Sequence, residues 1–137
     1  MCLIKIDSKE EINEFKKTIP TEGITVYKVA RERKGKYYPV FSHAQFPFKS
    51  GLNKADTTEK IIAGWWNNHI NYQAGFHFWI NKIDAEIDKK DFKEGFYFSF
   101  KIIECKIKKS WITSVGMNKI NDYLLGKTVV TNKAIFP

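Results

Sequence analysis

Hydrophobic and polar positions along this chain alternate mostly with the two-residue period of β-strands. Runs rich in β-branched and aromatic residues, separated by polar turns, predict about six strands. They cover residues 24–30, 37–41, 75–80, 96–107, 111–115 and 127–135. The apolar phase of the longest run changes between Ile102 and Ile103, and such a change predicts a β-bulge there. Gly35, in the turn after the first run, is the expected position of a positive φ.

Three segments show helical spacing instead. A capping box that starts at Ser8 opens the first helix, which should end near Thr18 because a proline follows. A second capping box over residues 56–59 predicts a helix over residues 57–68. The third predicted helix covers residues 82–90 and follows an asparagine that can cap it.

The order of these elements, α-β-β-α-β-α-β-β-β, predicts an α+β fold with a bent, mostly antiparallel sheet and about three helices. A length of 137 residues suits one hydrophobic core, so we expect a single domain over residues 1–137. The core should contain the apolar side chains that share a phase within each element. These are Phe15, Val26, Ile62, Trp65, Phe78, Phe98 and Phe100.

Charge and composition narrow the class of partner. The chain has 23 Lys and Arg against 15 Asp and Glu, a net charge of +8, which favours an anionic partner and excludes an acidic surface that mimics DNA. No apolar run approaches the roughly 20 residues that span a membrane, so no membrane partner is expected. The N-terminus lacks a signal-peptide pattern, and Cys2 and Cys105 form neither a disulfide framework nor a zinc motif. We therefore expect a cytoplasmic location.

The basic residues gather in two groups with aromatic residues nearby in the sequence. Cations beside aromatic rings are typical of phosphate or nucleic-acid contacts, and solubilising charge on exposed turns is the alternative. The first group is Arg31, Arg33, Lys34 and Lys36, and the second is Lys106, Lys108 and Lys109.

His77 and Trp79 are candidate ligand-binding residues. In the alternating run over residues 75–80 they share one face, while Phe76 and Phe78 share the other. If the face with His77 is an open cleft, Trp79 could stack on a base and His77 could donate or accept a hydrogen bond. The alternative is a strand buried on both faces, in which both residues are structural.

Glu104 interrupts the longest apolar run. Its carboxylate could point into a cleft with a raised pKa, or it could mark the solvent face of the strand. The sequence contains no nucleophile elbow, no glycine-rich phosphate loop and no spacing of metal ligands. We therefore expect no catalytic residue, metal or cofactor.

Several short motifs follow one another in an order that resembles a group of small proteins from phages and bacterial mobile elements. The motifs are MCL at residue 1, YKV at residue 27, YYPV at residue 37, GFH at residue 75 and a C-x-I strand at residue 105. This resemblance implies a phage accessory protein in the cytoplasm of the host cell. It favours a non-catalytic inhibitor of a bacterial defence system, which would bind a nucleotide signal, a nucleic acid or the host defence protein itself.

The layout is also similar to that of ADP-ribosyltransferases. Tyr27, His77 and Glu104 match the positions that hold NAD and catalyse transfer in that family. Lys28 stands where the family has Arg or His, and the Ser or Thr of the second strand is absent, which favours a fold that binds without reacting. Such an enzyme and a structural, virion-associated protein remain the alternatives, and a homo-oligomer is compatible with each.

Overall fold

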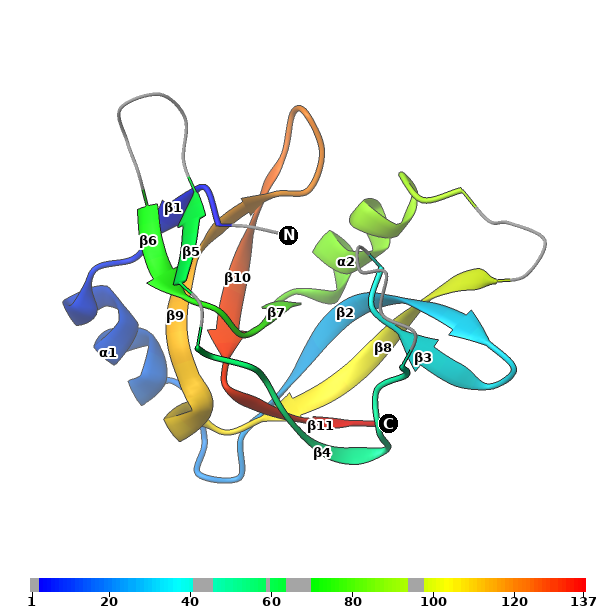
Figure 1. The fold of residues 1–137 in the computed structure, drawn as a ribbon. Coiled ribbons are helices and arrows are strands. Elements are labelled where there is room, and N and C mark those ends of the chain that lie inside the picture. The colour runs from blue at the N-terminus through cyan, green and yellow to red at the C-terminus, as the bar shows by residue number, and fades with distance from the viewer. Residues whose placement is uncertain (1–2, 41–45, 59, 64–69, 94–97) are drawn as a thin grey trace.

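The structure is a computed structural model that describes residues 3–40, 46–58, 60–63, 70–93 and 98–137. Within these residues a nine-stranded sheet has the order β1-β9-β10-β7-β2-β8-β11-β4, and β3 pairs with β2 outside this path. A separate two-stranded sheet joins β5 (Lys60–Ala63) and β6 (Ile70–Gln73). All pairings between these strands are antiparallel (Figure 1).

The large sheet is built from short and long strands, and two helices accompany it in the described part of the chain. The helices are α1 (Lys9–Lys17) and α2 (Lys82–Lys89), and a 3-10 turn covers Lys109–Trp111. The strands are β1 (Lys5–Ile6), β2 (Ile24–Arg33), β3 (Lys36–Tyr38), β4 (Gly51–Lys54), β7 (Phe76–Trp79), β8 (Ser99–Ile107), β9 (Ile112–Lys119), β10 (Leu125–Thr131) and β11 (Lys133–Phe136). The α+β class is thus confirmed, with a larger sheet than predicted. None of the described helices has the length and apolar character needed to cross a bilayer.

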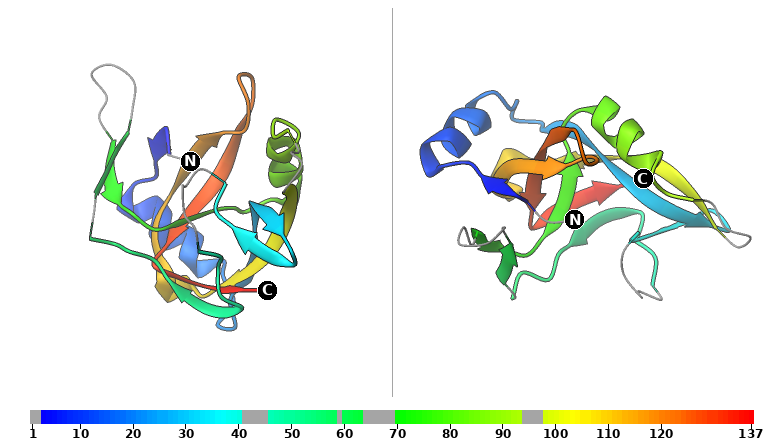
Figure 2. Two further views of the ribbon diagram at one scale, coloured as in Figure 1. Left: turned by 45° about the vertical axis from the view of Figure 1, so that its right-hand side comes forward. Right: turned by 90° about the horizontal axis from the view of Figure 1, so that it is seen from above.

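The large sheet curls around its main hydrophobic core, as the two views of Figure 2 show. Strands β7 and β11 are three positions apart in the strand order, which in a flat sheet corresponds to about 14 Å. Phe136 of β11 nevertheless has its ring centroid 6.0 Å from that of Phe78 and 5.3 Å from that of Phe76, both in β7. The chain bends at Asn132, so β10 pairs with β9 and β7 while β11 pairs with β8 and β4. The predicted strand over residues 127–135 is therefore two strands.

Helix α1 has the predicted ends. Ser8 accepts a hydrogen bond from the backbone N–H of Glu11, and the Glu11 carboxylate accepts one from the backbone N–H of Ser8. The helix ends at Thr18, whose backbone N–H and hydroxyl both donate to the carbonyl of Phe15. Its apolar side, including Ile12 and Phe15, packs on the core.

Helix α2 covers the opposite face of β7, β2 and β8. Ala85 and Ile87 of this helix pack with Trp79, Tyr27 and Ile102 of the three strands. These strands are therefore covered on both faces, by the core on one side and by α2 on the other.

This double cover explains the change of apolar phase in β8. Ile102 faces α2, whereas Ile103 and the alternate residues after it face the main core. The ladder between β2 and β8 runs without a shift from Ile24 paired with Ile107 to Glu32 paired with Ser99. The predicted bulge at residues 102–103 is wrong, because a strand covered on both faces needs no bulge to bury both phases.

The predicted helix over residues 57–68 is wrong in the part of this range that the structure describes. Residues 60–63 form β5, which pairs with β6, and Ile61 and Ile62 are β-branched residues that favour a strand. Asp56 accepts hydrogen bonds from the backbone N–H and hydroxyl of Thr58, so it caps a local turn rather than a helix. Residues 59 and 64–69 lie outside the described part.

The predicted core is confirmed in its centre. Val26 and Phe78 are 0% exposed, and Phe100 is also buried. Phe15 packs on the core while partly buried, and Phe98 is half-buried just before β8. The side chains of Ile62 and Trp65 lie outside the described part of the structure.

Candidate functional site

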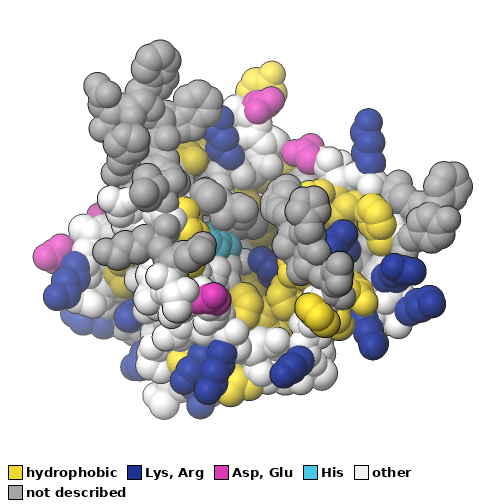
Figure 3. All heavy atoms as spheres, viewed as in Figure 1, with side chains coloured by type: hydrophobic (Ala, Val, Ile, Leu, Met, Phe, Trp, Pro, Cys, Tyr) yellow, Lys and Arg dark blue, Asp and Glu magenta, His cyan; other side chains and the backbone are white. Residues whose placement is uncertain are grey.

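A cavity of about 320 Å³ lies where β2 and β7 separate. The two strands are paired at Tyr27 and Trp79, and beyond this pair the space between them opens. On the face shown in Figure 3, hydrophobic side chains gather around β2, β3 and β11, and Lys and Arg side chains surround them. This opening between two central strands is the candidate site.

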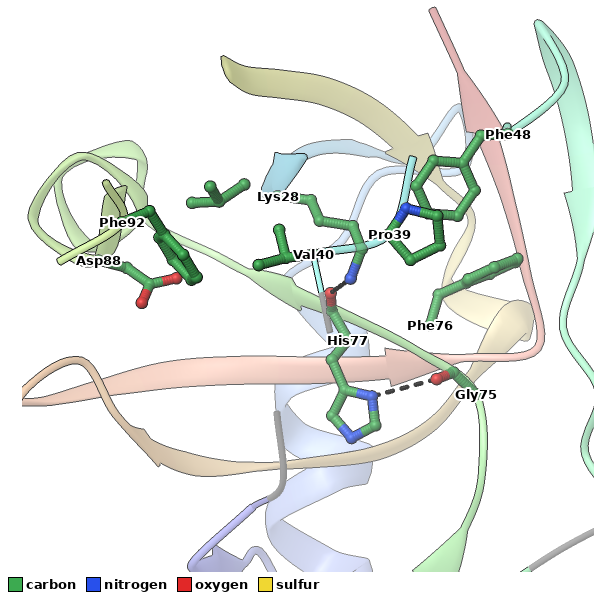
Figure 4. A pocket seen from close by; sticks show the side chains of 10 residues that line it. Lys28, Pro39, Val40, Phe48, Gly75, Phe76, His77, Asp88 and Phe92 are labelled. Carbon is green, nitrogen blue, oxygen red and sulfur yellow. Dashed lines mark hydrogen bonds between the residues drawn. The ribbon is translucent and has the colours of Figure 1, made fainter. Parts of the chain in front are cut away.

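The walls of the cavity are mostly apolar and aromatic. Phe48 and Phe76 lie on one side, with their rings edge to face and their centroids 6.3 Å apart (Figure 4). Phe92 lies on the other side, just beyond the end of α2, and residues 39–40 lie between the two sides. A flat apolar group of a ligand would therefore contact aromatic rings from two directions.

Lys28 brings a cation to this cavity. It lies on the core-facing side of β2 between Val26 and Ala30, which are both 0% exposed. Its Nζ donates a hydrogen bond to the His77 carbonyl oxygen at 3.1 Å and lies 5.7 Å from the centroid of the Phe78 ring. No carboxylate of the described residues lies within ion-pair distance of this ammonium. Burial lowers the pKa of Lys28, and the nearby Cys105 and Asp88 oppose that shift.

Asp88, in the last turn of α2, is the carboxyl group that lines the cavity. Its Oδ2 accepts a hydrogen bond from the indole N–H of Trp79 at 3.1 Å. Its second oxygen has no hydrogen bond to a described residue. Burial raises the pKa of Asp88, while the hydrogen bond from Trp79 lowers it in part.

His77 contributes its main chain, not its imidazole, to the Lys28 hydrogen bond, and its ring points to the other side of β7 (Figure 4). Its Nδ1 lies 3.1 Å from the carbonyl oxygen of Gly75, which can only accept, so Nδ1 carries the proton. Nε2 then accepts from the hydroxyl of Tyr72 at 2.9 Å, and that hydroxyl accepts from the backbone N–H of Leu3. The imidazole therefore ties the N-terminal segment to β6 and β7.

Burial of this imidazole and, as a smaller cause, the charge of Lys28 together lower the pKa of His77 to about 4. His77 is only 6% exposed. The preceding Gly75 packs so closely on β10 that a Cβ atom there would collide with the carbonyl oxygen of Thr131. The GFH motif thus has a structural explanation in this fold.

Trp79 is 0% exposed and lies under α2, packed against Ala85 and Ile120. The prediction that His77 and Trp79 share an open face is therefore wrong, because α2, the N-terminal segment and β6 cover that face. The alternative of a strand buried on both faces describes β7 correctly. Trp79 cannot act as an open stacking surface in this arrangement.

Tyr27 and Glu104 lie opposite each other in the ladder between β2 and β8, and Tyr27 also lies opposite Trp79. These three candidate residues thus form one row across the face that carries α2, outside the lining of the cavity. The Glu104 side chain is 58% exposed, and its Oε1 lies 3.6 Å from Nζ of Lys82. Of its two interpretations, the solvent face applies.

The two basic groups lie at opposite ends of the ladder between β2 and β8. This ladder is about 26 Å long, from the eight steps between its terminal pairs at about 3.3 Å each. Arg33, Lys34 and Lys36 are exposed around the tight turn, where Lys34 and Gly35 both have positive φ as the sequence predicted for Gly35. Lys106, Lys108 and Lys109 are exposed at the other end. The groups are therefore two separate surfaces.

Arg31 differs from the other basic residues. It is half-buried, and its Nε donates a hydrogen bond to the carbonyl oxygen of Pro39 at 3.0 Å. Its guanidinium also lies 5.9 Å from the centroid of the Phe98 ring. Because Pro39 lines the cavity, Arg31 holds one wall of it in place.

Sequence reasoning did not select Lys28, Asp88 or the aromatic residues of the cavity as site residues. A signal for Lys28 was present, since a lysine between Val26 and Ala30 falls on the apolar side of an alternating strand. Asp88 and Phe92 had no such signal, because only the packing of α2 brings them to β2.

Comparison of the chain with protein-family models, with curated proteins and with solved structures finds no match. Among the described residues that line the cavity, the groups that can bind a ligand are one ammonium, one carboxyl group and aromatic rings on two sides.

Proposed function

We propose that this protein is a non-catalytic binding protein whose ligand is a small anion with a flat apolar body, held in the cavity beside Lys28. The observation that carries the proposal is a half-buried ammonium whose one hydrogen bond to a described residue goes to a peptide carbonyl. An ammonium has three N–H donors. Two donors of Lys28 thus have no partner among the described residues and can bind oxygen atoms of a ligand.

Charge supports an anionic ligand. Removing a cation from water costs free energy unless an opposite charge pairs with it. The His77 carbonyl and the Phe78 ring offset part of it, but neither carries a net charge. An anionic group of the ligand would supply the missing charge. The rings of Phe48, Phe76 and Phe92 would then contact its apolar body, and stacking of this kind contributes about 1–3 kcal/mol per base.

Size favours a nucleotide signal over the other two targets, a nucleic acid and a host defence protein. A volume of about 320 Å³ lies at the lower end of the roughly 300–1,000 Å³ typical of small-ligand pockets. It suits one nucleoside-sized group and not a strand of several nucleotides. Together with the resemblance to phage accessory proteins, this supports a role in which the protein counteracts a bacterial defence system by sequestering a small nucleotide in the host cytoplasm.

The two alternatives lack their supporting geometry. A transferase would need the Glu104 carboxylate buried close to His77, whereas Glu104 is exposed and β2 lies between their strands. A structural, virion-associated protein would be supported by a broad flat apolar surface. The exposed large hydrophobic side chains of the described residues form only small groups, a run over residues 123–125 and the cross-strand pair Leu52 and Ile135, and no broad surface. Neither alternative is proposed.

Replacing Lys28 with methionine should weaken the binding of anionic ligands about tenfold or more, because a hydrogen bond to a charged group contributes about 1.5–3 kcal/mol. Methionine keeps an unbranched apolar chain and removes the charge. Isothermal titration calorimetry with nucleoside monophosphates and aryl carboxylates measures the loss. Removal of a poorly paired cation should leave the thermal midpoint unchanged or raise it.

Lys101→Met is the matched control, since Lys101 is an exposed cation on the neighbouring strand β8. It should bind like the wild type. A wild-type protein that binds none of these compounds at millimolar concentration contradicts the proposal, as does a Lys28→Met variant with wild-type affinity.

A further inference from the structure

We propose that the ligand carries an amino group at the end opposite its anionic group, and that Asp88 is the residue that recognises this amino group. This inference rests on the proposed function, and it names the ligand class more closely: an aromatic anion with an N–H donor, such as a nucleotide with an amino-bearing base. Asp88 is then a specificity-determining residue of the cavity.

The first argument is that the cavity holds two opposite charges that are kept apart. Lys28 extends from β2, and Asp88 comes from the end of α2 on another wall (Figure 4). Both groups are half-buried, yet their side chains do not form an ion pair. In such surroundings two opposite charges would stabilise each other if they met. A ligand with an anionic and an N–H-donating end satisfies both groups at once.

The second argument is the hydrogen bonding of Asp88. The indole N–H of Trp79, which is fixed in the packing under α2, holds Oδ2 at 3.1 Å. This bond orients the carboxyl group and leaves its other oxygen without a partner among the described residues. A carboxylate oxygen in a cavity accepts hydrogen bonds and donates none, so it selects an N–H group over a carbonyl oxygen.

The third argument is that one aromatic ring of the cavity, that of Phe92, lies beside Asp88. Phe92 and Asp88 lie together on one side of Lys28, and Phe48 and Phe76 lie on the other (Figure 4). A flat ring system that contacts Phe92 while its anionic group reaches Lys28 brings its far edge towards Asp88. Hydrogen-bonding sites of this kind discriminate strongly, because a ligand without the donor leaves a buried acceptor unpaired.

The test compares adenosine monophosphate with purine riboside monophosphate, which lacks only the 6-amino group. Calorimetry on the wild-type protein should show about tenfold or greater preference for the amino compound. Asp88→Asn keeps an oxygen that can accept from Trp79 and replaces the other oxygen with a donor. The variant should lose that preference while it keeps its affinity for purine riboside monophosphate. A second pair, 4′-aminobiphenyl-4-carboxylate and biphenyl-4-carboxylate, tests an aryl carboxylate as the source of the same chemistry.

Asp91→Asn is the control, because Asp91 is an exposed carboxylate just after the same helix and does not line the cavity. It should keep the preference for the amino compound. The ratio of the two affinities would not change if Asp88 had only a structural role. Equal binding of both members of each pair, with affinity still lost in Lys28→Met, overturns the inference and leaves the proposed function standing. No binding of any member refutes both.

Discussion

Replacing Phe78 with alanine should lower the free energy of unfolding by about 3–5 kcal/mol. Phe78 is 0% exposed in the middle of β7, and its ring lies 6.2 Å from that of Phe76 and 6.0 Å from that of Phe136. Truncation would leave an empty cavity in the main core, among side chains of β9, β10 and β11. Because small domains are stable by only about 5–15 kcal/mol, the variant should lie close to unfolding. Urea denaturation followed by circular dichroism measures the loss.

Phe98→Ala provides the comparison, since it removes the same side chain from a half-buried position. The Phe98 ring contacts Phe100 edge to face at 5.4 Å, and Arg31 lies over it, but it is outside the main core. Phe98→Ala should lower the free energy of unfolding clearly less than Phe78→Ala does. Equal losses at the two positions would show that β7 does not pack into the centre of the core.

Lowering the pH from 7 to 4 should cost the folded protein about 3 kcal/mol through His77 alone. The imidazole has an ordinary pKa of 6.5 when unfolded and a pKa of about 4 when folded. Between these values the unfolded chain binds the proton and the folded chain does not, so stability is full above pH 6.5 and falls towards pH 4. The difference of about 2.5 pH units corresponds to about 3 kcal/mol.

Proton NMR of the imidazole measures this pKa directly in the wild-type protein. His77→Gln, which cannot titrate, should show a flatter fall in urea-denaturation stability between pH 7 and pH 4.5. Protonation would also reverse the Tyr72 hydrogen bond, because an imidazolium Nε2 can only donate. A pKa near 6.5, or an unchanged pH dependence in the variant, would contradict a buried neutral imidazole.

The elements that could be predicted from the sequence are those whose cause is local. Ser8 and Glu11 are three residues apart and cap α1 through their own backbone, so the start of that helix needs no distant partner. The β-branched run of β2 and the helical pattern of α2 are equally local. The helix predicted over residues 57–68 failed because Ile61 and Ile62 suit both states, and pairing with β6 decides between them.

The candidate site was only partly predictable for the same reason. The sequence predicted His77 and Trp79 as ligand-binding residues on an open face, and this was wrong because alternation alone does not say what covers each face. Helix α2 packs on Trp79, and the N-terminal segment reaches His77 through Tyr72, and both contacts join parts of the chain that a local pattern cannot relate. The result is a structural histidine instead of an exposed one.

By itself, the sequence determined the α+β class, the basic charge, the ends of α1 and the position of a lysine among the apolar residues of β2, because these follow from residue type and short-range spacing. Tertiary structure alone decided that Lys28 and Asp88 line one cavity, that Trp79 is buried and that the two basic groups lie at opposite ends of a ladder about 26 Å long. The physical reason is that burial and pairing depend on contacts between segments that are distant in the sequence. The curl of the sheet determines which of these segments come into contact.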